Sequence, residues 1–326
     1  MKLGRNHCFK IFGLLVFLFL ISLVSLYQFP TPLSRSMDEV RFFHILLKIR
    51  LPELLMAITA GAALGLAGAL MQIVLDNPLA SPFTLGISSA AAFGAALSIV
   101  LGISSGLAWL NASAFALAFS ALSVVILLAI SLCMGVSKKN IILVGLAVNF
   151  FFSSANTLMQ YYASPDAVYQ IMFWTAGSLT NATLNDSLRL FIVFAISLVT
   201  ALLFSNDMGI IQQGERNAVM HGVNVTLERI LILAICSLLA SFSVSIIGII
   251  GFVGLVAPHI CRQLGLESPK LLVISSSVAG ALLLVVSDAI SKTLLNPTIL
   301  PISAVTSCLG IPLVVVLMAL KRRKEL

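Results

Sequence analysis

Residues 52–72 read PELLMAITAGAALGLAGALMQ, a stretch with one charged side chain, at Glu53. About 20 apolar residues in an α-helix cross the roughly 30 Å hydrocarbon core of a bilayer. Within the stretch Gly61, Gly65 and Ala69 recur every four residues, a spacing that places small side chains on one helix face and lets another backbone approach closely. The stretch therefore predicts a membrane-spanning helix that packs against protein.

The rest of the chain has the same character. Of its 326 residues 60% are hydrophobic and 10% are charged, whereas a soluble domain is about 45–50% apolar and about 25% charged. This composition excludes a soluble enzyme, a disordered chain and a disulfide scaffold. We expect an all-α polytopic membrane protein in which residues 1–326 form a single transmembrane domain. Apolar runs predict about ten spans, at roughly 11–29, 52–72, 85–102, 108–134, 141–162, 188–205, 229–249, 252–265, 271–291 and 300–320.

Positive charges indicate the orientation. The net charge is +7, and most of the 19 Lys and Arg residues fall on the side that carries both termini, including the basic tail at 321–324. Under the positive-inside rule this side is cytoplasmic. The basic residues stand between apolar runs, so we expect no nucleic-acid partner. The first run, Ile11–Leu26, ends without a small-residue cleavage site and predicts a retained span, not a signal peptide.

Three connections are long enough to carry function: outer segments at about 30–50 and 163–187, and an inner segment at about 206–228. In the inner segment Gly214 and Gly222 bracket Glu215 to His221. This pattern predicts two short helices split by a glycine turn, which can dock in a groove of a soluble partner, with Ala218 allowing close contact. A solvated connector is the alternative.

Ionisable groups inside the membrane are costly and usually functional, and the predicted spans hold almost none. Asp288 and Lys292, four residues apart, predict a local ion pair or a cap near the outer end of their span, in preference to a coupling site. His259, after Pro258, is expected to be structural in preference to a ligand or a proton relay. The five cysteines are scattered, which predicts small buried side chains and no metal site.

Motifs of catalysis are missing from the sequence. It contains no H-E-x-x-H, no G-x-S-x-G and no pair of convergent carboxylates, which disfavours an intramembrane enzyme. It also contains no P-loop. If ATP drives transport here, another polypeptide hydrolyses it.

Several strings occur in order over about residues 40–320. They are Arg50-Leu51-Pro52, Asn77-Pro78-Leu79-Ala80-Ser81-Pro82, Phe173-Trp174 with Gly177-Ser178, Gly214-Glu215-x-x-Ala218-x-x-x-Gly222, and Gly248-x-x-Gly251-Phe252-Val253-Gly254-Leu255-Val256-Ala257-Pro258-His259. Together they resemble the permease family of ABC importers for ferric siderophores, haem and vitamin B12. For Asn77, Pro78, Pro82, Gly251 and Gly254 a structural role is sufficient, because proline stops helices and glycine suits a reversal under close packing.

The resemblance implies a multi-pass protein of the cytoplasmic (inner) membrane. Its partners would be two ATPase subunits, a second permease subunit (identical or not) and an outer binding protein that delivers an iron chelate. It implies no cofactor on this chain, since ATP and Mg²⁺ are used by the ATPase. The implied ATPase-coupling residues are Gly214, Glu215, Arg216, Ala218, His221 and Gly222.

The implied docking residues for the binding protein are Arg50, Glu53 and Lys292. Glu53 departs from the family, which usually has arginine there, and this departure is compatible with a heterodimeric permease. Vitamin B12 or haem are alternative cargoes of the same class. An ion-coupled secondary carrier and an inert membrane scaffold are the alternatives from other classes.

Overall fold

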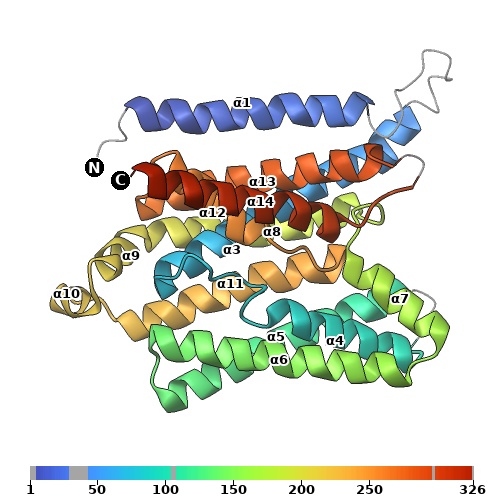
Figure 1. Ribbon diagram of the computed structural model, residues 1–326, viewed down its shortest axis with the longest axis horizontal. Helices are drawn as coiled ribbons and strands as arrows, with labels where there is room; N and C mark the ends of the chain where they lie inside the picture. Colours follow the sequence, from blue (N-terminus) through green and yellow to red (C-terminus); the bar gives the residue numbers. More distant parts are fainter. Residues whose placement is uncertain (1–4, 29–42, 104–107, 296–297, 325–326) are drawn as a thin grey trace.

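The computed structural model describes residues 5–28, 43–103, 108–295 and 298–324, and within them the regular structure is entirely helical (Figure 1). A short π-helix, η1 (Leu46–Arg50), precedes the long central helix. The α-helices are α1 (Arg5–Gln28), α3 (Leu51–Leu75), α4 (Ile87–Val100), α5 (Ala108–Met134), α6 (Lys138–Tyr162), α7 (Pro165–Ala176), α8 (Leu184–Leu203), α9 (Ser205–Gln212), α10 (Glu215–Met220), α11 (Val225–Ile247), α12 (Val253–Gln263), α13 (Pro269–Thr293) and α14 (Ile302–Lys324).

Each of the ten predicted spans overlaps one of these helices, so the all-α membrane fold is confirmed. Within the described ranges seven helical stretches are long and apolar enough to cross a bilayer on their own. The apolar stretches Ile87–Val100 and Ile302–Val315 are shorter, and α12 has 11 residues. The exact number of crossings therefore stays a prediction.

Helix α3 forms the centre of the bundle, and nearly all of its residues are buried. Glycines explain how closely its neighbours approach. A Cβ on Gly61 or Gly65 would collide with the backbone of α13 at Gly280 and Ser276, and a Cβ on Gly68 would collide with the carbonyl oxygen of Gly254 in α12. The prediction that this helix packs against protein is confirmed.

Large apolar side chains are exposed along the outer helices, as expected for surfaces that face lipid. Examples are Phe12 and Phe19 of α1 and Phe150 of α6. The four cysteines whose side chains the structure describes divide accordingly: Cys236 and Cys261 are buried, whereas Cys133 and Cys308 are exposed. The side chain of Cys8 lies outside the described part. The prediction of buried cysteines is wrong for the exposed pair, because their helices turn one apolar face outward.

The predicted loop at 30–50 needs a correction. Residues 29–42 lie outside the described part, but residues 43–50 are helical and run directly into α3. Pro52 lacks an N–H and its ring crowds the preceding turn, which normally breaks a helix. Here the chain widens into η1, where the Leu51 N–H donates to the Leu46 carbonyl, and the helix continues.

The outer segment at 163–187 contains α7, which the sequence analysis missed. The Ser164 side chain accepts a hydrogen bond from the Ala167 N–H, and Pro165 occupies the first turn. Serine followed by proline is a helix-start signal. The helix ends at Gly177, whose φ of 73° favours glycine.

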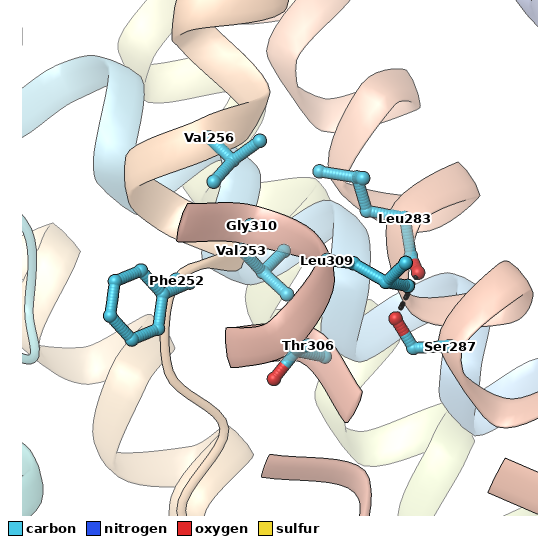
Figure 2. A pocket seen from close by; sticks show the side chains of 8 residues that line it. All are labelled: Phe252, Val253, Val256, Leu283, Ser287, Thr306, Leu309 and Gly310. Carbon is cyan, nitrogen blue, oxygen red and sulfur yellow. Dashed lines mark hydrogen bonds between the residues drawn. The ribbon is translucent and has the colours of Figure 1, made fainter. Parts of the chain in front are cut away.

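Between α11 and α12 the chain leaves the helix and re-enters it, as the glycine pattern predicted. Gly248 has φ 75° and Phe252 has φ 65°. Figure 2 shows Phe252 and Val256 beside Gly310 of α14, with Ser287 of α13 donating to the Leu283 carbonyl. The cavity among these side chains measures about 10 Å³, room for about one water and no cargo.

The two ends of the bundle differ. One end of the bundle holds the start of α1, the end of α14 and the short helices α9 and α10, and the other end holds α7 (Figure 1). Lys10 Nζ donates to the Leu264 carbonyl at 2.6 Å, which ties the start of α1 to the α10 end. Both described helix termini therefore share one side, and its assignment to the cytoplasm stays a prediction.

Candidate functional site

The segment 206–228, here the α9–α10 loop, forms two short helices at the α10 end of the bundle. Gly214 lies between α9 and α10 with φ 127°, and Gly222 follows α10 with φ 81°. Side chains other than glycine rarely adopt these conformations. The prediction of two short helices split by a glycine turn is confirmed.

An ion pair fixes α10 to α11. The Arg229 guanidinium donates to Glu215 Oε1 at 2.5 Å and to the Val136 carbonyl at 3.0 Å. The Arg229 side chain is 2% exposed, whereas that of Glu215 is 49% exposed. The hydrogen bond from Arg229 lowers the pKa of Glu215 below its usual value, against the opposing effect of burial. The sequence analysis singled out Glu215 and missed its buried partner.

Ala218 requires a correction. It was expected to allow close contact with a partner, but it is fully buried and packs with Ile211 and Val225 inside the chain. Its small side chain lets α10 lie against α9 and the start of α11. The residues that α10 presents outward are Val219, 64% exposed, and Met220, 72% exposed. In the sequence, the available signal for this surface was the apolar pair Val219-Met220 within an otherwise polar segment.

The remaining residues of this set lie around α10. Arg216 is exposed on its first turn. His221 ends the helix, with its Nδ1 2.8 Å from the Asn217 carbonyl oxygen. Thus the structure brings together all six predicted coupling residues, and their coupling role stays a prediction.

At the opposite end three charged side chains meet in the interior. Lys292 Nζ donates to Asp288 at 2.7 Å and to Glu53 at 2.8 Å, and each side chain is less than 10% exposed. The predicted Asp288–Lys292 ion pair is confirmed. The prediction that no two carboxylates converge is wrong. Glu53 and Asp288 both contact the Lys292 ammonium, although their helices are far apart in sequence.

The predicted docking residues for a binding protein are buried. Arg50 donates to the Leu26 carbonyl at 2.8 Å, and Glu53 and Lys292 belong to the buried ionic cluster with Asp288. In this conformation their charges are engaged within the chain. Their docking role stays a prediction.

The expected structural residues form turns and contacts. Asn77 Oδ1 accepts from the Leu79 N–H at 2.9 Å in the turn between α3 and α4, which also contains Pro78 and Pro82. Gly251 lies in the break before α12 and Gly254 packs on Gly68. Pro258 lies inside α12, and the Nδ1 of His259 is 3.2 Å from the Leu255 carbonyl oxygen.

A cavity of about 360 Å³ lies at the α7 end of the bundle. Phe173, Trp174 and Ser178 from the predicted outer motif line it, together with Gly248 and Leu300 from two other connections. No charged side chain lines it in the described part of the chain. Its aromatic, aliphatic and amide lining can hold a bulky ligand through weak contacts.

The sequence model of the FecCD transport family matches residues 14–320. The chain belongs to the FecCD transport family. It is therefore a membrane-spanning transport permease of the ABC class, located in the cytoplasmic membrane and not itself a catalytic subunit.

Relatives of this permease have transport functions in their names. The "Probable iron chelatin transport system permease protein" of Helicobacter pylori (strain J99) is 32% identical over 82% of this chain and 80% of its own length. The vitamin B12 import system permease protein BtuC of Citrobacter koseri is 32% identical over 85% and 83%. A solved inward-facing structure described as a metal-chelate type ABC transporter has a TM-score of 0.87 and 27% identity, covering 95% of this chain and 98% of the other.

Proposed function

We propose that this permease translocates a ferric siderophore across the cytoplasmic membrane, driven by ATP hydrolysis on separate ATPase subunits that bind the α9–α10 loop. The single observation that carries the coupling is the fixed geometry of that loop. Its outward residues Val219 and Met220 are exposed, while Glu215 and Arg229 hold it rigidly on α11. A solvated connector would need neither the anchored ion pair nor the exposed apolar face.

Helix α11 offers a mechanical link between the two ends. It begins beside the α9–α10 loop, where Arg229 pairs with Glu215 of α10. It ends at Ile247, which lines the uncharged cavity together with Gly248. Closure of the ATPase subunits would displace α10 and, through the ion pair, α11. Transport then proceeds by alternating access, in which the cargo binds the two states with different free energies.

The cavity supports an iron chelate as cargo. Its lining is uncharged, so it can contact a bulky chelate without a tight ionic site that would stall release. The iron chelatin permease of Helicobacter pylori and the metal-chelate transporter structure favour this class of substrate. Haem and vitamin B12 are the alternative cargoes, the latter favoured by the BtuC relative.

The assembly would contain a second permease subunit and an outer binding protein. We expect no cofactor on this chain, with ATP and Mg²⁺ bound by the ATPase subunits. The experiment reconstitutes the permease with its ATPase in proteoliposomes and measures uptake of a ferric siderophore, haem and vitamin B12, each presented on its binding protein.

ATP-dependent uptake of the ferric siderophore, lost when the ATPase is omitted, is the expected result. Preferred uptake of haem or vitamin B12 would replace the substrate assignment. Uptake driven by an ion gradient without any ATPase would refute the mechanism and favour a secondary carrier.

A further inference from the structure

A second cavity, of about 230 Å³, lies where α9, α10 and α11 meet. Two carboxylates line it, Asp207 from the first turn of α9 and Glu228 from the first turn of α11, together with His221 at the end of α10. No Lys or Arg of the described residues lines it. This acidic cavity opens on the same end of the bundle as the α9–α10 loop.

The Glu228 carboxylate is not fully satisfied by the described residues. Its residue is 4% exposed, and its Oε1 is buried without a hydrogen bond in the described structure. Buried carboxylates are nearly always hydrogen-bonded or paired, because an uncompensated buried charge is costly. The neighbouring Arg229 does not fill this need, since its guanidinium bonds Glu215 and the Val136 carbonyl. The Glu228 Oε1 acceptor thus has no donor among the described residues, and a second carboxylate, that of Asp207, lines the same cavity.

We propose that the acidic cavity receives an arginine or lysine side chain from the ATPase subunit. This inference rests on the proposed function, because it takes the α9–α10 loop as the surface that the ATPase binds. Charge complementarity supports it, since two carboxylates and no cation of the described residues line the cavity. The cavity is also many times larger than the roughly 10–15 Å³ that one water needs by the same measure, so a long side chain can enter.

The surroundings of the cavity suit a protein partner. Leu227, which lines it, is 61% exposed, and Val219 and Met220 of α10 are exposed nearby in sequence. An apolar rim that a partner covers excludes water from a charge pair and strengthens it. The acidic cavity and the outward face of α10 would then form one continuous docking surface.

A metal ion is the other occupant that carboxylates and histidine suggest. Within the described residues, no three His, Cys, Asp or Glu side chains lie close enough to hold one. Two carboxylates from separate helices instead match the several N–H donors of a guanidinium or the three of an ammonium. The contacts therefore favour a cationic side chain.

The test compares Glu228→Gln, Asp207→Asn and the double variant with the wild-type chain in lipid nanodiscs. The control is Glu267→Gln, which removes a carboxylate from the turn between α12 and α13. The titrant is the ATPase subunit that supports ATP-driven uptake with the wild-type chain. Loss of a desolvated charge pair should weaken binding by about 10- to 100-fold in the double variant, while the control stays within about twofold.

Equal affinity of the double variant and the wild type would overturn the inference and indicate a water-filled vestibule. The proposed function would survive that result, because the wild type still binds. Failure of every ATPase subunit to support ATP-driven uptake with the wild-type chain, which leaves no titrant, would refute the proposed function itself. Titration with Mg²⁺ alone that shows binding in the wild type and none in the double variant would overturn the inference in favour of a metal site.

Two further measurements separate docking from a structural role. Glu228→Gln keeps the side-chain shape and removes an uncompensated buried charge, so the melting temperature of the chain alone should stay equal or rise. A fall would assign Glu228 to the stability of the fold. A photo-crosslinking residue at position 227 should join an ATPase peptide that contains Arg or Lys, and crosslinks confined to lipid or to the chain itself would overturn the inference.

Discussion

The guanidinium of Arg229, buried at the start of α11, donates to the half-exposed carboxylate of Glu215 at 2.5 Å. This contact joins the short helix α10, the proposed docking surface, to the long helix α11, which ends at the uncharged cavity. Because the two residues are 14 positions apart, the contact depends on the turn after α10 as well as on the two helices. Under the proposed function, a displacement of α10 reaches α11 through this contact.

Reversing the charge at Glu215 should uncouple transport. In Glu215→Lys two cations face each other, and the buried Arg229 loses the acidic partner that it has among the described residues. We expect α10 to detach from α11 and ATP-dependent uptake to fall by about tenfold or more, with the chain still inserted. The measurement is uptake in proteoliposomes, normalised to the amount of protein.

The control is Lys270→Glu, a charge reversal at an exposed residue in the first turn of α13. Its uptake should match that of the wild type within about twofold. Equal loss in both variants would show that the net charge of the chain matters and the specific pair does not.

The Glu215–Arg229 pair should also give stability a defined pH dependence. Hydrogen bonding lowers the pKa of Glu215 in the folded chain below its usual value. A lowered folded pKa contributes stability above the unfolded value, and the contribution is lost as the pH falls through the folded value. The melting temperature of the wild type should exceed that of Glu215→Gln at neutral pH, and the difference should vanish in acid.

Half of the Glu215 side chain is exposed, so this difference will be small. Melts of both chains in the same nanodiscs at a series of pH values measure it. A difference that persists unchanged at acidic pH would mean that the Glu215→Gln substitution perturbs packing and that the carboxylate charge has no role.

Local patterns predicted the helices, since apolar runs and their proline or glycine ends are properties of neighbouring residues. The same patterns found the α9–α10 loop through Gly214 and Gly222. They missed α7, because its 12 residues are too few to resemble a span. They also placed a loop at about 30–50, whereas residues 43–50 are helical and the π-helix at Leu46–Arg50 leads directly into α3.

Contacts between distant segments lay beyond these patterns. Glu53 and Lys292 are 239 residues apart and meet only because glycines bring α3 and α13 together. Spacing within one helix predicted the Asp288–Lys292 pair, and no local signal pointed to the third member. Burial of Ala218 and the isolation of Glu228 Oε1 likewise depend on how α9, α10 and α11 pack.

The buried ionic cluster predicts an order of stabilities. Lys292→Met leaves Glu53 and Asp288 close together without a cation, and we expect a loss of about 3–5 kcal/mol. Glu53→Gln keeps the Lys292–Asp288 pair and puts an amide in place of the Glu53 carboxylate, so it should lower the free energy of unfolding by about 1 kcal/mol. Thermal melts of the purified chains measure both losses.

Arg189→Ala is the matched control, because the exposed Arg189 pairs with the partly exposed Asp186 on α8 at 3.6 Å. It should change stability by less than about 0.5 kcal/mol. If Lys292→Met is as stable as this control, the two carboxylates share a proton or reach water, and the cluster is not a constraint on α3 and α13.

Gly68→Ala should disrupt the centre of the bundle. The added methyl group would overlap the carbonyl oxygen of Gly254, and both partners are backbone, so no side chain can rotate away. Overpacking of a filled core typically costs about 1–3 kcal/mol and more where the backbone must move; with α12 displaced from α3 we expect the upper end of that range. The amount of folded permease recovered from membranes, and its melting temperature, should both fall.

Gly13→Ala is the control for this change. Gly13 lies in α1, and a Cβ there meets nothing within 4 Å, so the variant should fold like the wild type or slightly better, as alanine favours helix. The comparison isolates the steric contact from the general effect of removing a glycine. A stable Gly68→Ala chain would show that α12 can shift away from α3 at little cost, and such freedom would make this contact a hinge of the transport cycle.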